Sequence, residues 1–449
     1  MSTNIQKNQI TEGIIWRQLL LFFFPILLGT FFQQLYNTID SVIVGQFVGK
    51  EALAAVGGSS AQIVAFVVGF FTGLSSGASV TIAQFFGAKD SRSANKGLHT
   101  AYAIAAFGGL ILTVSGIILT PFLLEMMNTP ADIVADSAVY LRIYFAGIIF
   151  VLIYNMGSAI LRATGDSKRP LYYLIVCCII NIVLDVLFVI VFHMGVMGVA
   201  VATLIAQAVS AVLVTLKLMR SEGILKLSVK QIRFHGSILK MQLKLGLPTG
   251  FEAILFSITN IAIQSAVNTF GTDTTAAWSA YGKLDAIFWM VSTAFGIAIT
   301  TFVGQNYGAG KMDRVRKSTR VCLLMDFIVS AVLVVFLIAA RFLLFRLFTN
   351  DSHVIEIGCD MLVLITPWYI VYVFIEVIAG ALRGVGNVVV PVAITLLGVC
   401  VLRIAWLAAM LKISPTISAI ILSYPVTWVI TALAFIIYYI YITHKTIAG

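Results

Sequence analysis

The stretch ILRATGDSKRP, residues 160–170, has a counterpart in ALRGVGNVVVP, residues 381–391. Leucine, arginine, glycine and proline recur at the same four places, 221 residues apart. A second pair, AQFFGAKD at 83–90 and GQNYGAGK at 304–311, repeats with the same offset. Two separate motifs that share one offset indicate that the chain consists of two copies of one unit.

The composition places both copies in a membrane. Of the 449 residues, 60% are hydrophobic and 11% are charged, and the mean hydropathy is +1.01. Soluble domains carry about 25% charged residues, and a soluble chain this poor in charge lacks the polar groups to cover its surface. The apolar runs have the length of spanning helices, whereas barrel strands alternate over about ten residues. We therefore predict an all-α integral membrane protein.

Apolar segments separated by polar loops define twelve predicted spans. They cover approximately 18–45, 53–83, 98–125, 134–162, 170–192 and 195–219, then 238–268, 275–304, 318–346, 354–383, 388–411 and 416–442. Six spans per copy is an even number, so both copies enter the bilayer in the same sense. We expect two six-helix lobes related by a pseudo-two-fold axis along the membrane normal. Their predicted bounds are 1–220 and 241–449, with a basic cytoplasmic connector at 221–240.

Basic residues gather in the loops that follow even-numbered spans, for example Lys89, Arg92 and Lys96. The positive-inside rule then predicts a multi-pass protein of the plasma (inner) membrane with both termini in the cytoplasm. The same distribution argues against a nucleic-acid partner, although the net charge is +10. The connector is expected to lie along the lipid headgroups. The alternative is that its basic residues bind a partner protein. The five cysteines all lie in apolar runs and form no C-x-x-C motif, so neither a metal site nor a disulfide framework is predicted.

Two carboxylates lie inside predicted spans that contain no nearby basic residue. Asp40 lies about 22 residues into the first span, or about 33 Å along a helix, and Asp185 about 15 residues into the fifth. Both spans start from the cytoplasm, so the two acids can share a depth. An intramembrane carboxylate costs roughly 2.5 to 3.5 kcal/mol, and one left unpaired tends to take up a proton. We therefore predict that the pair handles a coupling cation.

Asn181 stands four residues before Asp185 and shares its helix face. With Asn155 and Thr203 it would complete an oxygen-rich nest that suits sodium as well as a proton. The sequence leaves the two ions open, with sodium expected at Asp40, Asn181, Asp185 and Thr203 if it is the ion. Interhelical hydrogen bonding is the alternative role for these polar groups.

An ordered set of motifs resembles the multidrug and toxic compound extrusion (MATE) family. The set comprises LYNTIDSVIVGQFVG at 35–49, ILRATGD at 160–166 and NIVLD at 181–185, and the likeness covers nearly the whole chain. The resemblance implies two six-helix bundles around a cavity, and export of amphipathic, often cationic compounds in exchange for protons or sodium.

The resemblance also implies functional residues. The DinF-like branch, which has acids in its first and fifth helices, places a cation-coupling site on Asp40, Tyr140, Asn155, Asn181, Asp185 and Thr203, with Gln34 near it in sequence. The NorM-like branch adds acids in helices 7 and 10. Here Glu252 and Glu376 stand about one helical turn from those places, and we expect them, with Gln34, to border a substrate cavity. Pro25 and Pro248 lie at similar places in helices 1 and 7 and permit a bend.

We predict a secondary antiporter, with no cofactor beyond its coupling ion H⁺ or Na⁺, that acts as a monomer on small amphipathic substrates in the lipid bilayer. The first alternative is a flippase for lipid-linked oligosaccharides, which would need a cationic cleft. The intramembrane charges lean acidic instead: Asp40, Asp185, Glu252, Asp285, Asp326 and Glu376. The second alternative is an intramembrane enzyme, which would need a His pair, a Ser-Lys dyad or a paired-Asp motif on facing helices. Asp40 and Asp185 could be taken for the last of these, but no accompanying catalytic loop motif occurs. No G-x-x-x-x-G-K-[ST] loop for ATP occurs either.

Overall fold

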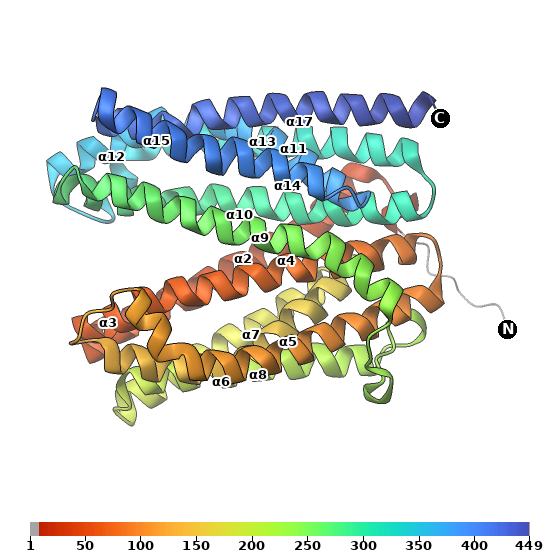
Figure 1. Cartoon of the computed structure of the whole chain (residues 1–449), viewed down its shortest axis with the longest axis horizontal. Coiled ribbons are helices and arrows are strands. Elements are labelled where there is room, and N and C mark those ends of the chain that lie inside the picture. The colour runs from red at the N-terminus through yellow and green to blue at the C-terminus, as the bar shows by residue number, and fades with distance from the viewer. Residues whose placement is uncertain (1–8, 449) are drawn as a thin grey trace. The chain divides into compact units, whose positions relative to one another are not determined.

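The computed structural model describes residues 9–448, and within them every regular element is a helix (Figure 1). Twelve of the helical segments in this range are long and apolar enough to cross a membrane. The all-α membrane fold predicted from composition is thereby confirmed, and each predicted apolar segment corresponds to one of these spans.

The first half contributes six spans. In chain order after the short α1 (Gln9–Glu12), they are α2 (Ile15–Ile43) with the π-helix η1 (Val44–Val48), α3 (Lys50–Gly57) with α4 (Ser59–Gly87), α5 (Ser91–Met126), α6 (Val134–Ala163), α7 (Lys168–Asp185) with the π-helix η2 (Val186–Val191), and α8 (Gly195–Met219). Two 3₁₀ turns, η3 (Gly223–Leu225) and η4 (Val229–Gln231), lie in the connector.

The second half contributes the other six. They are α9 (Gly236–Asn268), α10 (Thr272–Gly308), α11 (Met312–Arg346), α12 (Ser352–Ile365) with η5 (Thr366–Trp368) and α13 (Tyr369–Gly384), α14 (Val389–Thr395) with η6 (Leu396–Val401) and α15 (Leu402–Ile413), and α16 (Ile417–Ile421) with α17 (Ser423–Ala448).

The sequence repeat is also a repeat of helix ends. The spans that start at Ser91 and Lys168 have counterparts that start at Met312 and Val389, each 221 residues later. The repeated L-R-x-x-G motif forms the same helix C-cap twice. Gly165 and Gly386 have φ angles of 97° and 89°, a conformation open to glycine at no steric cost.

In each of these caps the glycine N–H and the N–H of the next residue donate hydrogen bonds to carbonyls of the last helical turn. Gly165 N–H donates to the Arg162 carbonyl and Gly386 N–H to the Arg383 carbonyl, both at 2.9 Å. The last carbonyls of each helix are thus bonded. The motif that revealed the duplication is therefore a helix-stop signal.

The chain folds into two compact units, and each is described by itself. One comprises Phe24–Gly250, and the other comprises the residues up to Phe23 together with Phe251 onward. The divisions fall inside α2 and α9, close to Pro25 and Pro248, whereas the lobes predicted at 1–220 and 241–449 divide at the connector. Those lobes remain a prediction about the duplicated halves.

Contacts explain why α9 begins in the unit formed by Phe24–Gly250. A Cβ on Gly73 of α4 would collide with the Gly250 nitrogen, and one on Gly77 would collide with the Gln242 carbonyl oxygen. Two glycines therefore let α4 and the first half of α9 touch backbone to backbone, as small residues do in membrane helix pairs.

The residues before Phe24 are held in the other unit by polar and aromatic contacts. Arg314 donates to the carbonyls of Ile10 and Gly13 at 2.9 and 2.8 Å. Phe23 stacks on Phe295 with ring centroids 4.1 Å apart. The start of α2 is thereby packed with second-half helices, and the rest of α2 with first-half helices.

Candidate functional site

The two acids predicted to handle a cation stand at equivalent points on their helices. Asp40 lies three residues before the end of α2 and Asp185 is the last residue of α7. Each helix continues as a π-helical stretch, η1 and η2, and these two stretches pack against each other. π-helical turns occur frequently at functional sites, so both acids stand where regular helix geometry gives way.

The structure brings four of the predicted residues to one point in the Phe24–Gly250 unit. The Asp40 carboxyl interacts with the side chains of Asp185, Thr203 and Asn181. All four are buried, with 8% of Asp40 and 0% of Asp185 exposed. Asp40 Oδ1, both Asp185 oxygens, the Asn181 amide and the Thr203 hydroxyl have no hydrogen-bond partner within the described residues. We call these four residues the acid pair cluster.

No basic side chain among residues 10–444 is found paired with this cluster. The ion pairs found in that range are Arg169–Asp166 and Arg383–Glu376, and neither involves the cluster. Two ionised carboxylates that face each other in a dry site repel, and removing both from water is costly. A proton or a small hard cation between them would remove the repulsion, and the neighbouring amide and hydroxyl supply further oxygen ligands.

The described residues contain no group of three or more His, Cys, Asp or Glu side chains suited to a metal ion. The cluster offers two carboxylates with an amide and a hydroxyl, which is a donor set for a proton or an alkali cation.

Tyrosines surround the acids. The structure places Tyr140 of α6 within interaction range of both Asp40 and Asp185. Its ring stacks on Tyr144, with centroids 6.2 Å apart and planes at 27°. Tyr36, one turn before Asp40, is 6% exposed and accepts a hydrogen bond from Gln207 Nε2 at 3.3 Å.

Two members of this group were missed in the sequence. Tyr36 is four residues before Asp40, and Gln207 is four residues after Thr203. The i,i+4 spacing that led from Asp185 to Asn181 would have found both.

Two further predicted residues, Asn155 and Gln34, differ in exposure. Asn155 is half-buried, and its place in the coupling site stays a prediction. Gln34 is exposed and stands six residues before Asp40, which turns it to another face of α2.

The predicted acids of the other unit meet each other and an arginine. Glu376 of α13 pairs with Arg383 at 3.1 Å, and Glu252 of α9 interacts with Arg383, Glu376 and Thr395. A Cβ at position 296 would collide with Glu376 Oε1, so Gly296 makes room for this carboxyl. In the sequence Arg383 marked only a helix end, and its side chain's role as counter-ion was missed.

A third, half-buried acid in this unit is fully hydrogen-bonded. Asp285 accepts bonds from the Tyr281 and Tyr369 hydroxyls at 3.1 and 2.5 Å and from Trp289 Nε1 at 2.7 Å.

Arg403, 3% exposed, lies near Asp285 and over the Tyr424 ring, with its guanidinium carbon 4.0 Å from the ring centroid. It donates to the Thr427 hydroxyl at 3.0 Å. The aromatic residues around Asp285 and Arg403 bury both charges with partners, in contrast to the acid pair cluster.

Comparison with known proteins shows the class of protein to which this twelve-span fold belongs. The family model described as MatE matches residues 25–187 and 248–407. The probable multidrug resistance protein YoeA of Bacillus subtilis is 30% identical over 86% of this chain and 84% of its own. The probable multidrug resistance protein NorM of Thermotoga maritima is 27% identical over 91% of this chain and 88% of its own.

Solved structures agree on the fold. A crystal structure of MATE in the straight conformation superposes with a TM-score of 0.92 at 20% identity and covers 100% of both chains. The chain belongs to the MATE family of membrane transporters. The resemblance drawn from its motifs is thereby confirmed, and at the level of the family the protein is a transporter and not an enzyme.

Proposed function

We propose that this chain is a cation-coupled antiporter that exports amphipathic, often cationic compounds, with the acid pair cluster as its coupling site. The observation that carries the proposal is the burial of two facing carboxyls, Asp40 and Asp185, without a counter-ion among the described residues. Relatives named as multidrug resistance and multidrug export proteins support the substrate class.

Cation occupancy would act on helix packing. With a proton or sodium bound, α2 and α7 can approach at the acids; without it, like charges push the two helix ends and their π-helical extensions apart. Pro25 leaves a backbone carbonyl of α2 unbonded and permits a bend there. A bend of α2 that follows occupancy at Asp40 couples the site to the lobe state, because each ligand then binds the two states differently.

Tyr36, Tyr140 and Gln207 position the site. The Gln207–Tyr36 bond ties α8 to α2 one turn from Asp40, and Tyr140 brings a hydroxyl from α6 to both acids. Together with Asp185 of α7 they connect four helices around the cation, so that a change at the acids alters the packing of all four.

On the substrate side, Glu252 and Glu376 share one counter-ion, Arg383. Two carboxylates and one guanidinium leave an excess of negative charge when all are ionised, which favours a cationic substrate. This excess also disfavours a flippase for pyrophosphate-linked sugars, which would need positive charge.

Ethidium efflux from proteoliposomes tests the proposal. Gradients of pH and of sodium are imposed in turn, and the gradient that drives efflux identifies the ion. Asp40→Asn and Asp185→Asn should each lower gradient-driven efflux at least tenfold. Asp166→Asn is the matched control, because Asp166 is already paired with Arg169 at the surface. Gradient-driven efflux that persists in Asp40→Asn would defeat the proposal.

We further propose that the protein works as a monomer in the plasma membrane. We also propose that both termini lie in the cytoplasm, on the basis of the loop charges. Cysteine labelling from each side of the membrane tests the topology. A label on residue 50 or 412 from outside and on residue 168 or 311 from inside is expected.

A further inference from the structure

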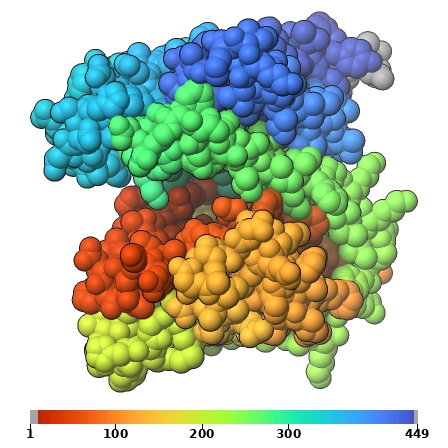
Figure 2. All heavy atoms as spheres, turned by 60° about the vertical axis from the view of Figure 1, so that its left-hand side comes forward, coloured from red at the N-terminus to blue at the C-terminus, as the bar shows by residue number. Residues whose placement is uncertain are grey.

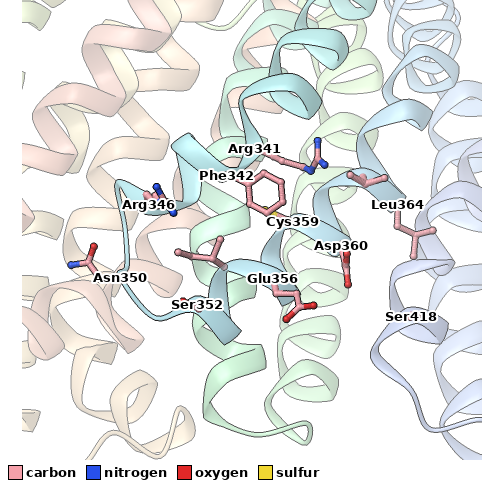
Figure 3. A pocket seen from close by; sticks show the side chains of 12 residues that line it. Arg341, Phe342, Arg346, Asn350, Ser352, Glu356, Cys359, Asp360, Leu364 and Ser418 are labelled. Atoms are coloured by element: carbon pink, nitrogen blue, oxygen red, sulfur yellow. The ribbon is translucent and has the colours of Figure 1, made fainter.

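A groove of about 1130 Å³ lies within the unit that contains Phe251 onward, where the end of α11, the length of α12 and the start of α16 meet (Figure 3). It is remote in sequence from the acid pair cluster and lies in the other unit. The cyan segment that includes α12 is at the surface on the face shown in Figure 2. The volume stands at or above the upper end of the range for drug-sized ligands, roughly 300 to 1000 Å³.

The lining changes from polar to apolar with depth. By the loop charges, α11 ends and α12 begins on the outer side of the membrane. Arg346, Asn350 and Ser352 lie at these helix ends, and Leu364 lies twelve residues into α12, about 18 Å deeper. A bilayer changes from headgroup to hydrocarbon over the same span.

Opposite charges stand together in the polar part without pairing. Arg341, Arg346, Glu356 and Asp360 all line the groove, and none belongs to an ion pair found among the described residues. Arg341 donates to the Ile338 carbonyl at 2.7 Å and lies over the Phe342 ring at 4.7 Å. In Figure 3 the Asp360 and Glu356 carboxyls lie on one helix, and Arg341 and Arg346 lie at separate places above and to the left of them.

This placement is costly without a ligand. Asp360 is exposed and lies eight residues into α12, about 12 Å from its outer end. An acid at membrane depth that faces lipid needs a partner. A ligand that carries both a cation and an anion, followed by apolar chains, would satisfy the acids, the arginines and the apolar depth of the groove at once.

We propose that the groove binds a phospholipid of the outer leaflet with a primary ammonium headgroup, of the phosphatidylethanolamine type. Its phosphate lies on Arg341 and Arg346, since guanidinium groups suit phosphate oxygens. Its ammonium donates to Glu356 and Asp360, as a lysine ammonium does with three N–H groups. Its acyl chains follow Phe342, Val363 and Leu364. A choline headgroup has no N–H to donate, and an anionic lipid would face two carboxylates.

Native mass spectrometry of the delipidated full chain in detergent tests this proposal, with lipids of identical acyl chains. The wild-type chain should retain phosphatidylethanolamine at least fivefold better than phosphatidylcholine or phosphatidylglycerol. Successive N-methylation of the headgroup should lower retention stepwise. This series needs no variant, so it stands even if a substitution unfolds the protein.

Variants assign the contacts. Glu356→Gln combined with Asp360→Asn should reduce phosphatidylethanolamine to the level of phosphatidylcholine, and Arg341→Gln should lower both. Asp136→Asn combined with Arg142→Gln is the matched control, because these exposed residues lie at the outer end of α6, outside the groove. Equal retention of all three lipids, strongest binding of phosphatidylglycerol, or an equal loss in the α6 control would each overturn the proposal.

Discussion

The two halves of the chain carry different kinds of residue at repeat-related positions. In the first half, Asp185, Thr203 and Gln207 lie at or next to an unpaired acid site. The residues 221 positions later are Trp406, Tyr424 and Trp428, and Asp40 corresponds to Ile261. The second half thus fills the same places with aromatic and aliphatic groups, of which Tyr424 and Trp428 lie against Arg403.

The difference teaches that duplication preserved helix ends and packing while the buried charges diverged. In one half the acids are left without partners, which is unfavourable for stability and useful for binding a cation. In the other half the half-buried Asp285 receives three donors and Arg403 has aromatic and hydroxyl partners. The fully buried Asp326 of that half accepts a bond from Ser330. Four predictions test this contrast, in order of decreasing effect.

The largest effect is expected when a first-half site residue is replaced by its second-half counterpart. Asp185→Trp, which copies Trp406, should abolish gradient-driven efflux, a loss of at least tenfold, because the cation loses its main ligand. A conservative change at the repeat-related position, Trp406→Phe, should stay within twofold of wild type. Efflux in proteoliposomes under an imposed gradient measures both. Equal losses in the two variants would show that the halves do not differ in role.

Thermal unfolding should separate the two kinds of acid by sign. Asp285→Ala leaves the Trp289 indole N–H without its acceptor, whereas the Tyr281 and Tyr369 hydroxyls keep the bond to each other at 2.9 Å. Stability should fall by about 1–3 kcal/mol, the cost of an unsatisfied buried group. Asp185→Asn removes a charge that has no partner, and stability should stay or rise. A larger loss in Asp185→Asn would contradict the contrast.

The prolines should also differ. Pro25→Ala restores a backbone bond in the helix that carries Asp40, so transport should slow several-fold if α2 bends with cation occupancy. Pro248→Ala alters α9, which has Ile261 in place of Asp40, and a smaller effect is expected. Initial efflux rates at saturating substrate measure the two. A stronger effect of Pro248→Ala would move the coupled bend to α9.

The smallest effect concerns the connector, which the first half binds through histidines. Ser228 N–H donates to His99 Nε2 at 3.0 Å, while His99 Nδ1 lies 2.8 Å from the Asn95 carbonyl oxygen. A carbonyl only accepts and an amide N–H only donates, so these bonds require the neutral ring with its proton on Nδ1.

His235 adds a titration to the same contact. Its Nδ1 lies 3.1 Å from the Thr100 hydroxyl, and burial, then the charges of Arg233 and Lys96 and the neighbouring His99, lower the pKa of His235. The folded protein therefore binds fewer protons than the unfolded chain. The neutral His235 ring therefore contributes stability above the pKa of histidine in the unfolded chain, about 6.5. This contribution is lost as the pH falls below that value.

Hydrogen exchange of residues 224–232, corrected for intrinsic rates, should consequently rise by a few-fold between pH 7.5 and pH 5.5. His235→Gln should remove most of that rise. The exposed His353 provides the control, since His353→Gln should leave the pH dependence unchanged. A pH dependence that survives in His235→Gln would assign it to other groups.

The sequence by itself determined the class, the duplication and the location of the acids. Composition and apolar run length predict spans without reference to any contact, and the motif repeat is a matter of local helix-stop signals such as Gly165 and Gly386. Asp40, Asn181 and Asp185 could be paired from spacing and shared depth alone, because these depend only on the helical period.

Only the tertiary structure decided which side chains meet. Rotation and packing of the helices placed Tyr36 and Gln207 near the acids and left Gln34 turned away. They also gave Glu376 its counter-ion in Arg383, and they gathered four unpaired charges in one groove. The boundaries of the compact units near Pro25 and Pro248 likewise depend on which helices the ends of α2 and α9 contact, which no local pattern encodes.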